Sequence, residues 1–274
     1  MARLVYIGGF GQSGSTLLES LLTANPQVVA CGEVANGFEG RTGRDLKCSC
    51  GALAKDCPVW CVFAPGSNAT LNHDALVLTL LEHVKNKYAI LCDSSKTAWG
   101  SNTAPFRLRR LLGERFFMLH LVRDPRAVCW SAIRLPLIKT RRKQQPTPIE
   151  QALSRPIPRC FRTAAGWWVA NLACELFGRL YPGQYLRLSY EEVASSPREV
   201  LHTVFGAAAP DLPARLDEPE ESGNRHQIYG NRMRRQRLRF ADVRLDDGWK
   251  SEMAPRHRRL AGALSWPLRL RYGY

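Results

Sequence analysis

Two features of membrane and exported proteins are missing from the sequence. No run approaches the roughly 18 to 20 uninterrupted apolar residues that a membrane-spanning helix needs. Residues 1–10 carry one arginine and a short apolar run that ends in glycines, without the longer apolar region and the cleavage site of a signal peptide. We therefore expect a cytoplasmic protein whose contact with a bilayer, if any, is peripheral.

Acidic residues are scarce relative to basic ones. The chain has 24 Asp and Glu against 39 Lys and Arg, a formal net charge of +15. This charge favours polyanionic partners such as nucleotides, nucleic acids, acidic glycans or an anionic membrane surface, and it does not choose among them. Aromatic residues are not interleaved with the basic stretches in a stacking pattern, so we expect no nucleic-acid partner.

The sequence also lacks an internal repeat and a linker between domains. Its 274 residues, 45% of them apolar, are enough for one sizeable core, and we expect a single domain over residues 1–274. Residues 138–159 are rich in Pro, Gln, Lys and Arg, a composition typical of a mobile loop that closes over a substrate.

The nine cysteines do not predict a disulfide framework, because no export signal accompanies them. Five stand singly in apolar surroundings and are expected in the core: Cys31, Cys92, Cys129, Cys160 and Cys174. The other four fall within one glycine-containing segment: Cys48, Cys50, Cys57 and Cys61. Their spacing fits no common zinc motif, so a zinc site and a pair of local bridges both stay open.

Short apolar strands alternate with helical patterns along the chain. Strands are predicted at residues 4–7, 89–92, 116–122 and 185–188, and helices at 16–23, 164–180 and 191–205. This alternation predicts an α/β fold with a central parallel sheet flanked by helices, a three-layer sandwich. Ligands of such sheets bind beyond the carboxyl ends of the strands, where the first three predicted strands each end in a polar cluster.

Residues 8–16 combine glycines with hydroxyl side chains at the start of a helix, a pattern typical of an anion-binding loop. Counted from Gly9, the Walker spacing holds through Gly14, but Ser15 stands where the phosphate-gripping lysine belongs. The spacing Gly9, Gly11, Gly14 also fits a dinucleotide fingerprint, with Glu33 at the right distance for a ribose. Because the Walker spacing is present, a nucleotide-dependent kinase or NTPase stays as an alternative despite the missing lysine.

A third family matches more of the chain. Residues 12–17 (Gln-Ser-Gly-Ser-Thr-Leu) resemble the 5′-phosphosulfate loop of the sulfotransferases that use 3′-phosphoadenylyl sulfate (PAPS), and residues 121–131 resemble their 3′-phosphate motif. Further similarity lies in residues 31–33, 93–96, 188–192, His226 and 230–234. The chain is most similar to the bacterial and protein-tyrosine types. The resemblance implies a P-loop-type fold and a basic segment, residues 225–274, that closes the donor site.

The resemblance assigns the donor-binding residues and implies that transfer requires no metal. The donor would be held by Gln12, Ser13, Gly14, Ser15, Thr16, Leu17, Arg123, Ser131, Tyr190, Arg232 and Arg234. Arg123 and Ser131 would bind the 3′-phosphate, because a guanidinium can grip two oxygens at once. From the residues alone, the alternative for Arg123 is an ion pair with Asp124 or a helix cap.

The resemblance also implies the catalytic residues Glu33, Lys96 and Gln12. Glu33 would be the base that takes the acceptor's proton, with His226 in reserve. Gln12 departs from the family, which usually has Arg or Lys there, so Lys96 or the cluster 232–235 would supply the cation. The acceptor is not readable from the sequence, so a hydroxyl of a small molecule, of a glycolipid, of a carbohydrate or of a peptide tyrosine stays open. A non-catalytic PAPS-binding relative stays open because of Gln12, and the oligomeric state is not readable.

Overall fold

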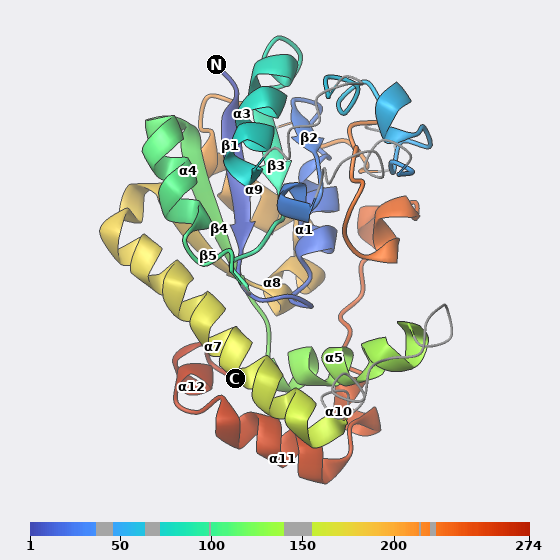
Figure 1. Cartoon of the computed structure of the whole chain (residues 1–274), viewed down its shortest axis with the longest axis vertical. Coiled ribbons are helices and arrows are strands. Elements are labelled where there is room, and N and C mark those ends of the chain that lie inside the picture. Colours follow the sequence, from blue (N-terminus) through green and yellow to red (C-terminus); the bar gives the residue numbers. More distant parts are fainter. Residues whose placement is uncertain (37–45, 64–71, 99, 140–154, 214, 220–222) are drawn as a thin grey trace.

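Five strands pair in parallel to form a single sheet at the centre of the chain (Figure 1). They are β1 (Arg3–Gly8), β2 (Val28–Ala30), β3 (Ile90–Asp93), β4 (Phe116–Val122) and β5 (Tyr185–Ser189), in the order β2-β3-β1-β4-β5. The computed structural model describes residues 1–36, 46–63, 72–98, 100–139, 155–213, 215–219 and 223–274, without the side chains of 135–139. Since β3 separates β2 from β1, the order differs from that of dinucleotide-binding folds.

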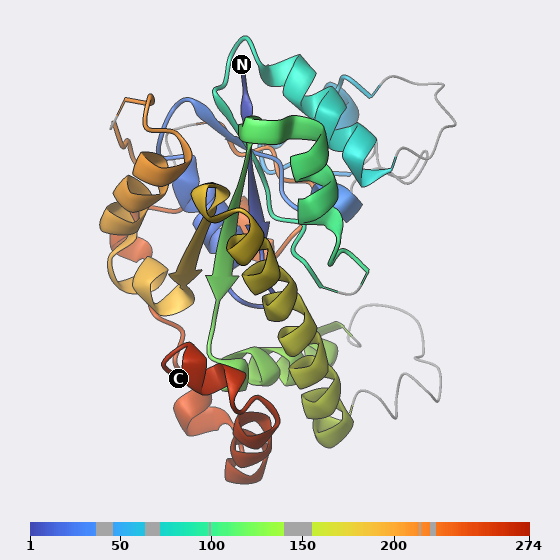
Figure 2. The same cartoon turned by 90° about the vertical axis from the view of Figure 1, so that its left-hand side faces the viewer.

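Helices cover both faces of the sheet (Figure 2). They are α1 (Ser15–Leu22), α3 (His73–Val84), α4 (Ala104–Leu112), α7 (Pro156–Leu180), α8 (Tyr190–Ser195) and α9 (Pro197–Ala208). Side chains of a strand alternate between faces, so Leu4 and Tyr6 of β1 join the core with α3, α4 and α7. Val5 and Ile7 join the core with α1, α8 and α9. The expected three-layer α/β fold is confirmed.

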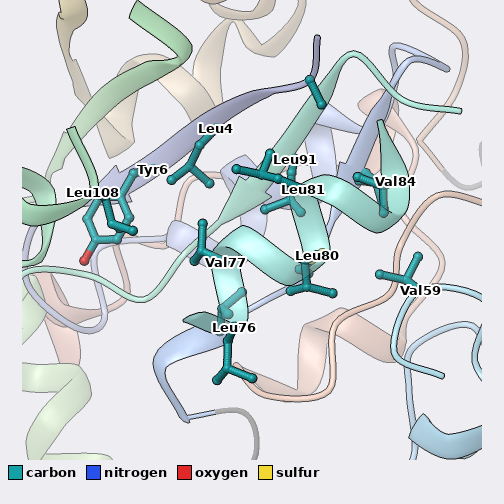
Figure 3. Close-up of a cluster of buried hydrophobic side chains, with 14 of the residues drawn as sticks. Leu4, Tyr6, Val59, Leu76, Val77, Leu80, Leu81, Val84, Leu91 and Leu108 are labelled. Atoms are coloured by element: carbon teal, nitrogen blue, oxygen red, sulfur yellow. The ribbon is translucent and has the colours of Figure 1, made fainter. Parts of the chain in front are cut away.

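The close packing on one face is visible between α3 and the sheet (Figure 3). Leu76, Leu80 and Leu81 recur at helical spacing on α3 and are buried with Leu4 and Leu91 of the strands. Burying a leucine side chain stabilises a fold by roughly 2 kcal/mol. This face therefore holds α3, and with it the segment carrying Val59, firmly against the sheet.

A second group of helices lies beyond the carboxyl ends of the strands (Figure 1). It consists of α5 (Pro125–Lys139), α10 (Trp249–Glu252), α11 (Pro255–Leu264) and α12 (Leu268–Arg271). Ala127 and Cys129 of α5 share a core with Cys160 of α7 and with Trp249 and Ala261 of the C-terminal helices. Residues 249–271 thus support α5 and α7 at this end of the sheet.

Several boundaries differ from the expectations. The strand β2 was not predicted, because three residues are too few for a pattern. The stretch 191–205 is two helices, since Pro197 starts a new one. The loop expected over 138–159 is helical at both ends, where α5 ends and α7 begins. Residues 140–154 lie outside the described residues.

Short 3-10 helices complete the secondary structure of the described residues: Val34–Asn36, Ala54–Asp56, Gly113–Arg115, Pro182–Gln184, Arg232–Arg235 and Phe240–Asp242. Within the described ranges, no helix combines the length and the apolar character needed to cross a bilayer. The five cysteines expected in the core are all buried, which confirms that prediction.

Candidate functional site

A pocket of about 860 Å³ opens at the carboxyl edge of the sheet. Each strand is followed within a few residues by a side chain that lines it: Glu33 after β2, Lys96 after β3, Gln12 after β1, Arg123 after β4 and Tyr190 after β5. The full lining is Gln12, Gly14, Ser15, Thr16, Leu17, Glu33, Lys96, Arg123, Ser131, Tyr190, Gly230, Asn231, Arg232, Met233, Leu238, Asp242, Val243, Arg244 and Asp246. Of the residues expected at the site, Ser13, Arg234 and His226 are not part of this lining.

The glycine-rich loop enters the pocket between β1 and α1. Gly14 stands at the N-terminal end of α1 with φ of 91°, and a Cβ there would lie 2.5 Å from the Tyr190 ring. Only glycine therefore fits. The first amides of a helix have no acceptor within the helix, and they carry the positive end of its dipole. In the described part of the chain, the buried Oγ of Ser13 also has no hydrogen-bond partner. The loop is thus a set of donors suited to an anion.

Two residues of the lining hold a backbone conformation that side chains rarely adopt. Among the residues that the structure describes, Gln12 (φ 69°) and Lys96 (φ 68°) are the non-glycine residues with positive φ. Such strain costs of order 1 to 3 kcal/mol and concentrates at functional sites. The two segments are joined directly, because the amide of Thr97 donates to the carbonyl of Gly9 at 3.1 Å. Lys96 is thereby fixed beside the glycine-rich loop.

Glu33 and Lys96 form an ion pair inside the pocket. The Nζ of Lys96 donates to Oε1 of Glu33, and the two side chains are 16% and 19% exposed, Lys96 first. Asn36 Nδ2 donates to the other carboxylate oxygen at 2.6 Å. A carboxylate and an ammonium thus face the same space, which allows proton acceptance next to stabilisation of negative charge.

Asp93 positions Glu33 and Lys96 through hydrogen bonds to the backbone beside them. Its Oδ1 accepts the amide of Ser95 at 2.9 Å and the amide of Val34 at 3.3 Å, the neighbours of Lys96 and Glu33 in sequence. Its Oδ2 lies 2.6 Å from Nε2 of His73. Burial acts to lower the pKa of His73, but the charge of Asp93, its hydrogen bond to the ring and the charge of Asp74 together outweigh burial, and the pKa is raised. The loops after β2 and β3 therefore share one anchor.

Arg123 also lines the pocket and is almost fully buried, with 6% of its surface exposed. Its Nη1 donates to the carbonyl of Gln12 at 3.2 Å, and its Nη2 donates to Oδ2 of Asp246 at 3.0 Å. The guanidinium lies over the Tyr190 ring, 4.1 Å from its centre. The alternative pair with Asp124 is wrong, because that carboxylate pairs with Arg126.

Two further contacts complete the expected donor site. The Oγ of Ser131 on α5 donates to Oε1 of Gln12 at 3.2 Å, which connects the 3′-phosphate motif with the glycine-rich loop. The amide of Asn231 donates to Oγ1 of Thr16 at 3.3 Å, which holds the residue before Arg232 over the start of α1. Arg234 turns back and donates to the carbonyl of Gly230 at 2.9 Å.

Part of the lining was not expected from the sequence. Met233, Leu238 and Val243 give the pocket an apolar side, and Arg244 and Asp246 add charges. Residues 236–246 are irregular apart from one 3-10 turn and carry no motif. The nearest signal was the expectation that the basic segment 225–274 closes the donor site, which singled out no residue between 236 and 246.

His226 lies away from the pocket lining. It is 3% exposed, and its Nδ1 is 3.2 Å from Sγ of Cys57. A base must reach the proton that it removes, so this position argues against the reserve role. Residues 230–233 of the neighbouring motif line the pocket, but His226 does not.

Glu19 on α1 is a fully buried carboxyl that the sequence did not single out. Its oxygens accept the amide of Gly32 at 2.6 Å, Oγ of Ser94 at 2.8 Å and Nε2 of Gln227 at 2.6 Å. Burial raises its pKa from 4.5 to about 7, although the three hydrogen bonds oppose the shift. Glu19 therefore joins three segments that lead to the pocket.

This carboxyl makes stability depend on pH. Between pH 4.5 and about 7 the native chain binds a proton that the unfolded chain has lost, so stability falls as pH rises. The shift corresponds to at most about 3 kcal/mol. We expect Glu19→Gln to remove this slope, measured by urea unfolding at about pH 5 and pH 8. Glu82→Gln, on the exposed side of α3, should keep it; equal slopes in wild type and Glu19→Gln would contradict the assignment.

The fold and the pocket define an α/β protein with an anion-binding type of loop at the carboxyl edge of a parallel sheet. The model of the sulfotransferase family matches residues 5–213. The chain therefore belongs to the sulfotransferase family, which makes it a transferase. A search of curated proteins found no significant match.

Solved sulfotransferase structures share the fold over nearly the whole chain. The sulfotransferase domain from the curacin biosynthetic pathway aligns with a TM-score of 0.58 and 18% identity, covering 96% of this chain and 97% of that one. The sulfotransferase domain of the Synechococcus PCC 7002 olefin synthase gives 0.56 and 19%, covering 97% and 95%. Mouse sulfotransferase SULT7A1, complexed with adenosine 3′,5′-bisphosphate (PAP), gives 0.51 and 12%, covering 96% and 81%.

Proposed function

We propose that this protein transfers a sulfuryl group from PAPS to a hydroxyl of a small-molecule, glycolipid or carbohydrate acceptor and releases PAP. One observation carries the proposal. The glycine-rich loop, Arg123 with Ser131, and the pair of Glu33 and Lys96 line the same pocket, although they follow different strands. A donor that carries phosphate groups on both the 3′ and the 5′ oxygen of its ribose needs two anion sites in one pocket.

The residues present fit this donor. The loop amides and the hydroxyls of Ser15 and Thr16, which line the pocket, supply donors for the 5′-phosphosulfate. Arg123, whose buried Nε has no partner in the described chain, and Ser131 would hold the 3′-phosphate. The apolar side of the pocket suits the adenine: Leu17, Met233, Leu238 and Val243.

The proposed reaction is a single displacement at sulfur. The acceptor oxygen attacks the sulfur while its proton passes to the Glu33 carboxylate, and the bond between sulfur and the bridging phosphate oxygen breaks. The electron pair of that bond stays on the phosphate of PAP, where Lys96 and the loop amides stabilise the charge. Gln12 adds a neutral donor, so Lys96 carries the cationic role that Gln12 lacks.

The kinase alternative has less support. Ser15 lines the pocket where a nucleotide-triphosphate site needs its lysine. A dinucleotide-binding site also has less support, because β1 and β2 pair in dinucleotide-binding folds, whereas β3 separates them here. A non-catalytic PAPS-binding role would leave the partly buried pair of Glu33 and Lys96 without a task.

Calorimetric titration of the purified protein with PAP, AMP, ATP and NAD tests the proposal. AMP is the matched control, because it differs from PAP only by the 3′-phosphate. A charge-assisted contact contributes roughly 1.5 to 3 kcal/mol, so PAP should bind about 10- to 100-fold more tightly than AMP. Tighter binding of ATP or NAD than of PAP would overturn the proposed donor.

A further inference from the structure

Three cysteines and one histidine that are distant in sequence meet outside the pocket. The candidate ligand atoms of Cys48, Cys50, Cys57 and His226 all lie within 4.8 Å of one another. The Sγ atoms of Cys57 and Cys48 are 3.6 Å apart, and Sγ of Cys57 is 3.2 Å from Nδ1 of His226. Among the residues that the structure describes, no other group of this kind occurs.

These distances match those between the ligands of a tetrahedral zinc ion. Zinc–sulfur bonds of about 2.3 Å and zinc–nitrogen bonds of about 2.0 Å place two sulfurs about 3.8 Å apart and a sulfur and a nitrogen about 3.5 Å apart. Three cysteines and one histidine are also a common ligand set of structural zinc sites. Both the spacing and the chemistry therefore fit one ion.

The backbone holds the four residues together without an ion. The amide of Cys48 donates to the carbonyl of Ala52 at 2.9 Å, which closes a tight turn around Cys50. Ser49 then binds both neighbours of His226: its Oγ donates to the carbonyl of Arg225 at 2.8 Å and accepts the amide of Gln227 at 2.8 Å. The contacts of Ser49 with the backbone on both sides of His226 thus place the imidazole beside the cysteines.

We propose that Cys48, Cys50, Cys57 and His226 bind one zinc ion in a structural site. His226 coordinates through Nδ1, the ring nitrogen that faces Cys57. Cys61 is exposed and outside the group, so it is not a ligand. Of the four clustered cysteines, three are therefore ligands in this proposal, and His226 is the fourth ligand.

The site joins the segment 46–61 to the segment that leads into the pocket. Trp60 Nε1 donates to the carbonyl of His226 at 2.5 Å, and Gly230 and Asn231 of the pocket lining follow a few residues later. Zinc would therefore fix the point at which the segment that follows His226 enters the pocket. An effect of zinc on PAP binding rests on the proposed function, whereas the zinc site itself does not.

Metal analysis of the whole protein, purified under reducing conditions without chelator, tests the site. We expect about one zinc per chain by mass spectrometry of the metal. Cys57→Ser and His226→Gln should each lose it, and the matched control Cys61→Ser should keep it. Removing zinc with a chelator should lower Tm by an amount on the order of 10 °C, and added zinc should restore it.

Two further measurements keep the test independent of folding failures and of activity. Cobalt(II) added to the metal-free wild-type chain should produce the absorption of a tetrahedral thiolate site, including thiolate-to-cobalt charge transfer. Peptide mapping should find Cys48 and Cys57 as unlinked thiols. A metal-free chain that takes up neither ion, a disulfide between Cys48 and Cys57 in the reduced preparation, or loss of zinc in Cys61→Ser would overturn the assignment.

Discussion

Glu33→Gln should slow sulfuryl transfer by about 100-fold or more, the usual contribution of a positioned general base. Glutamine has nearly the same shape and still meets Asn36, but it cannot take the proton of the attacking hydroxyl. Because Glu33 is assigned to the acceptor rather than to the donor, the Kd for PAP should change by less than about threefold. The substitution therefore separates the chemical step from donor binding.

The measurement is transfer of label from radiolabelled PAPS to an acceptor found by screening hydroxyl compounds. Acidity of the acceptor provides an internal check, since 4-nitrophenol needs less help to lose its proton than an alkyl alcohol does. The loss in Glu33→Gln should be smaller for the phenol. Glu82→Gln repeats the substitution at an exposed position and should transfer at the wild-type rate. Full activity of Glu33→Gln with an alcohol would show that another residue is the base.

The parts of the fold that sequence patterns predicted are those fixed by local composition. The strand β4 is a run of seven buried residues, and its predicted limits match the structure. The turn from β1 into α1 is marked by glycines that the backbone conformation requires. In contrast, β2 is three residues long and is stabilised by pairing with β3, which no local pattern records.

The same distinction holds for the pocket. Gln12, Lys96 and Arg123 could be predicted because each follows a strand end within a few residues, where the topology brings ligand-binding residues together. Asp246 and Val243 could not, because an irregular segment reaches the pocket only through tertiary contacts such as the hydrogen bond from the amide of Asp246 to the Tyr190 hydroxyl.

His226 shows how a motif can mislead when its neighbours belong to different structures. Its resemblance to the family, shared with residues 230–234, predicted a reserve role as the base. The bridge between Ala30 and Arg225 instead sets the chain beside β2, and the next residue points to the cysteines. Spacing rules for metal ligands do not span from residues 48–57 to residue 226, so this contact needed the structure.

Arg123→Ala should weaken PAP binding by about 100-fold and leave AMP binding within about threefold of wild type. The guanidinium is assigned to the 3′-phosphate, which AMP lacks, and a buried charge-assisted contact contributes up to about 3 kcal/mol. Calorimetric titration of both nucleotides against both proteins gives a cycle in which general damage to the pocket cancels. Equal losses for PAP and AMP would show that Arg123 supports the pocket without reading the 3′-phosphate.

Asp246 gives this prediction a counterpart of opposite sign. Its carboxylate accepts from Nη2 of Arg123, so a 3′-phosphate that binds the guanidinium must compete with it. The Asp246 side chain is 61% exposed, and releasing it to water therefore costs little. Asp246→Asn should tighten PAP binding by about two- to tenfold and leave AMP unchanged. If it instead weakens PAP binding, Asp246 holds Arg123 in the orientation that the phosphate needs, and the competition assigned to it is wrong.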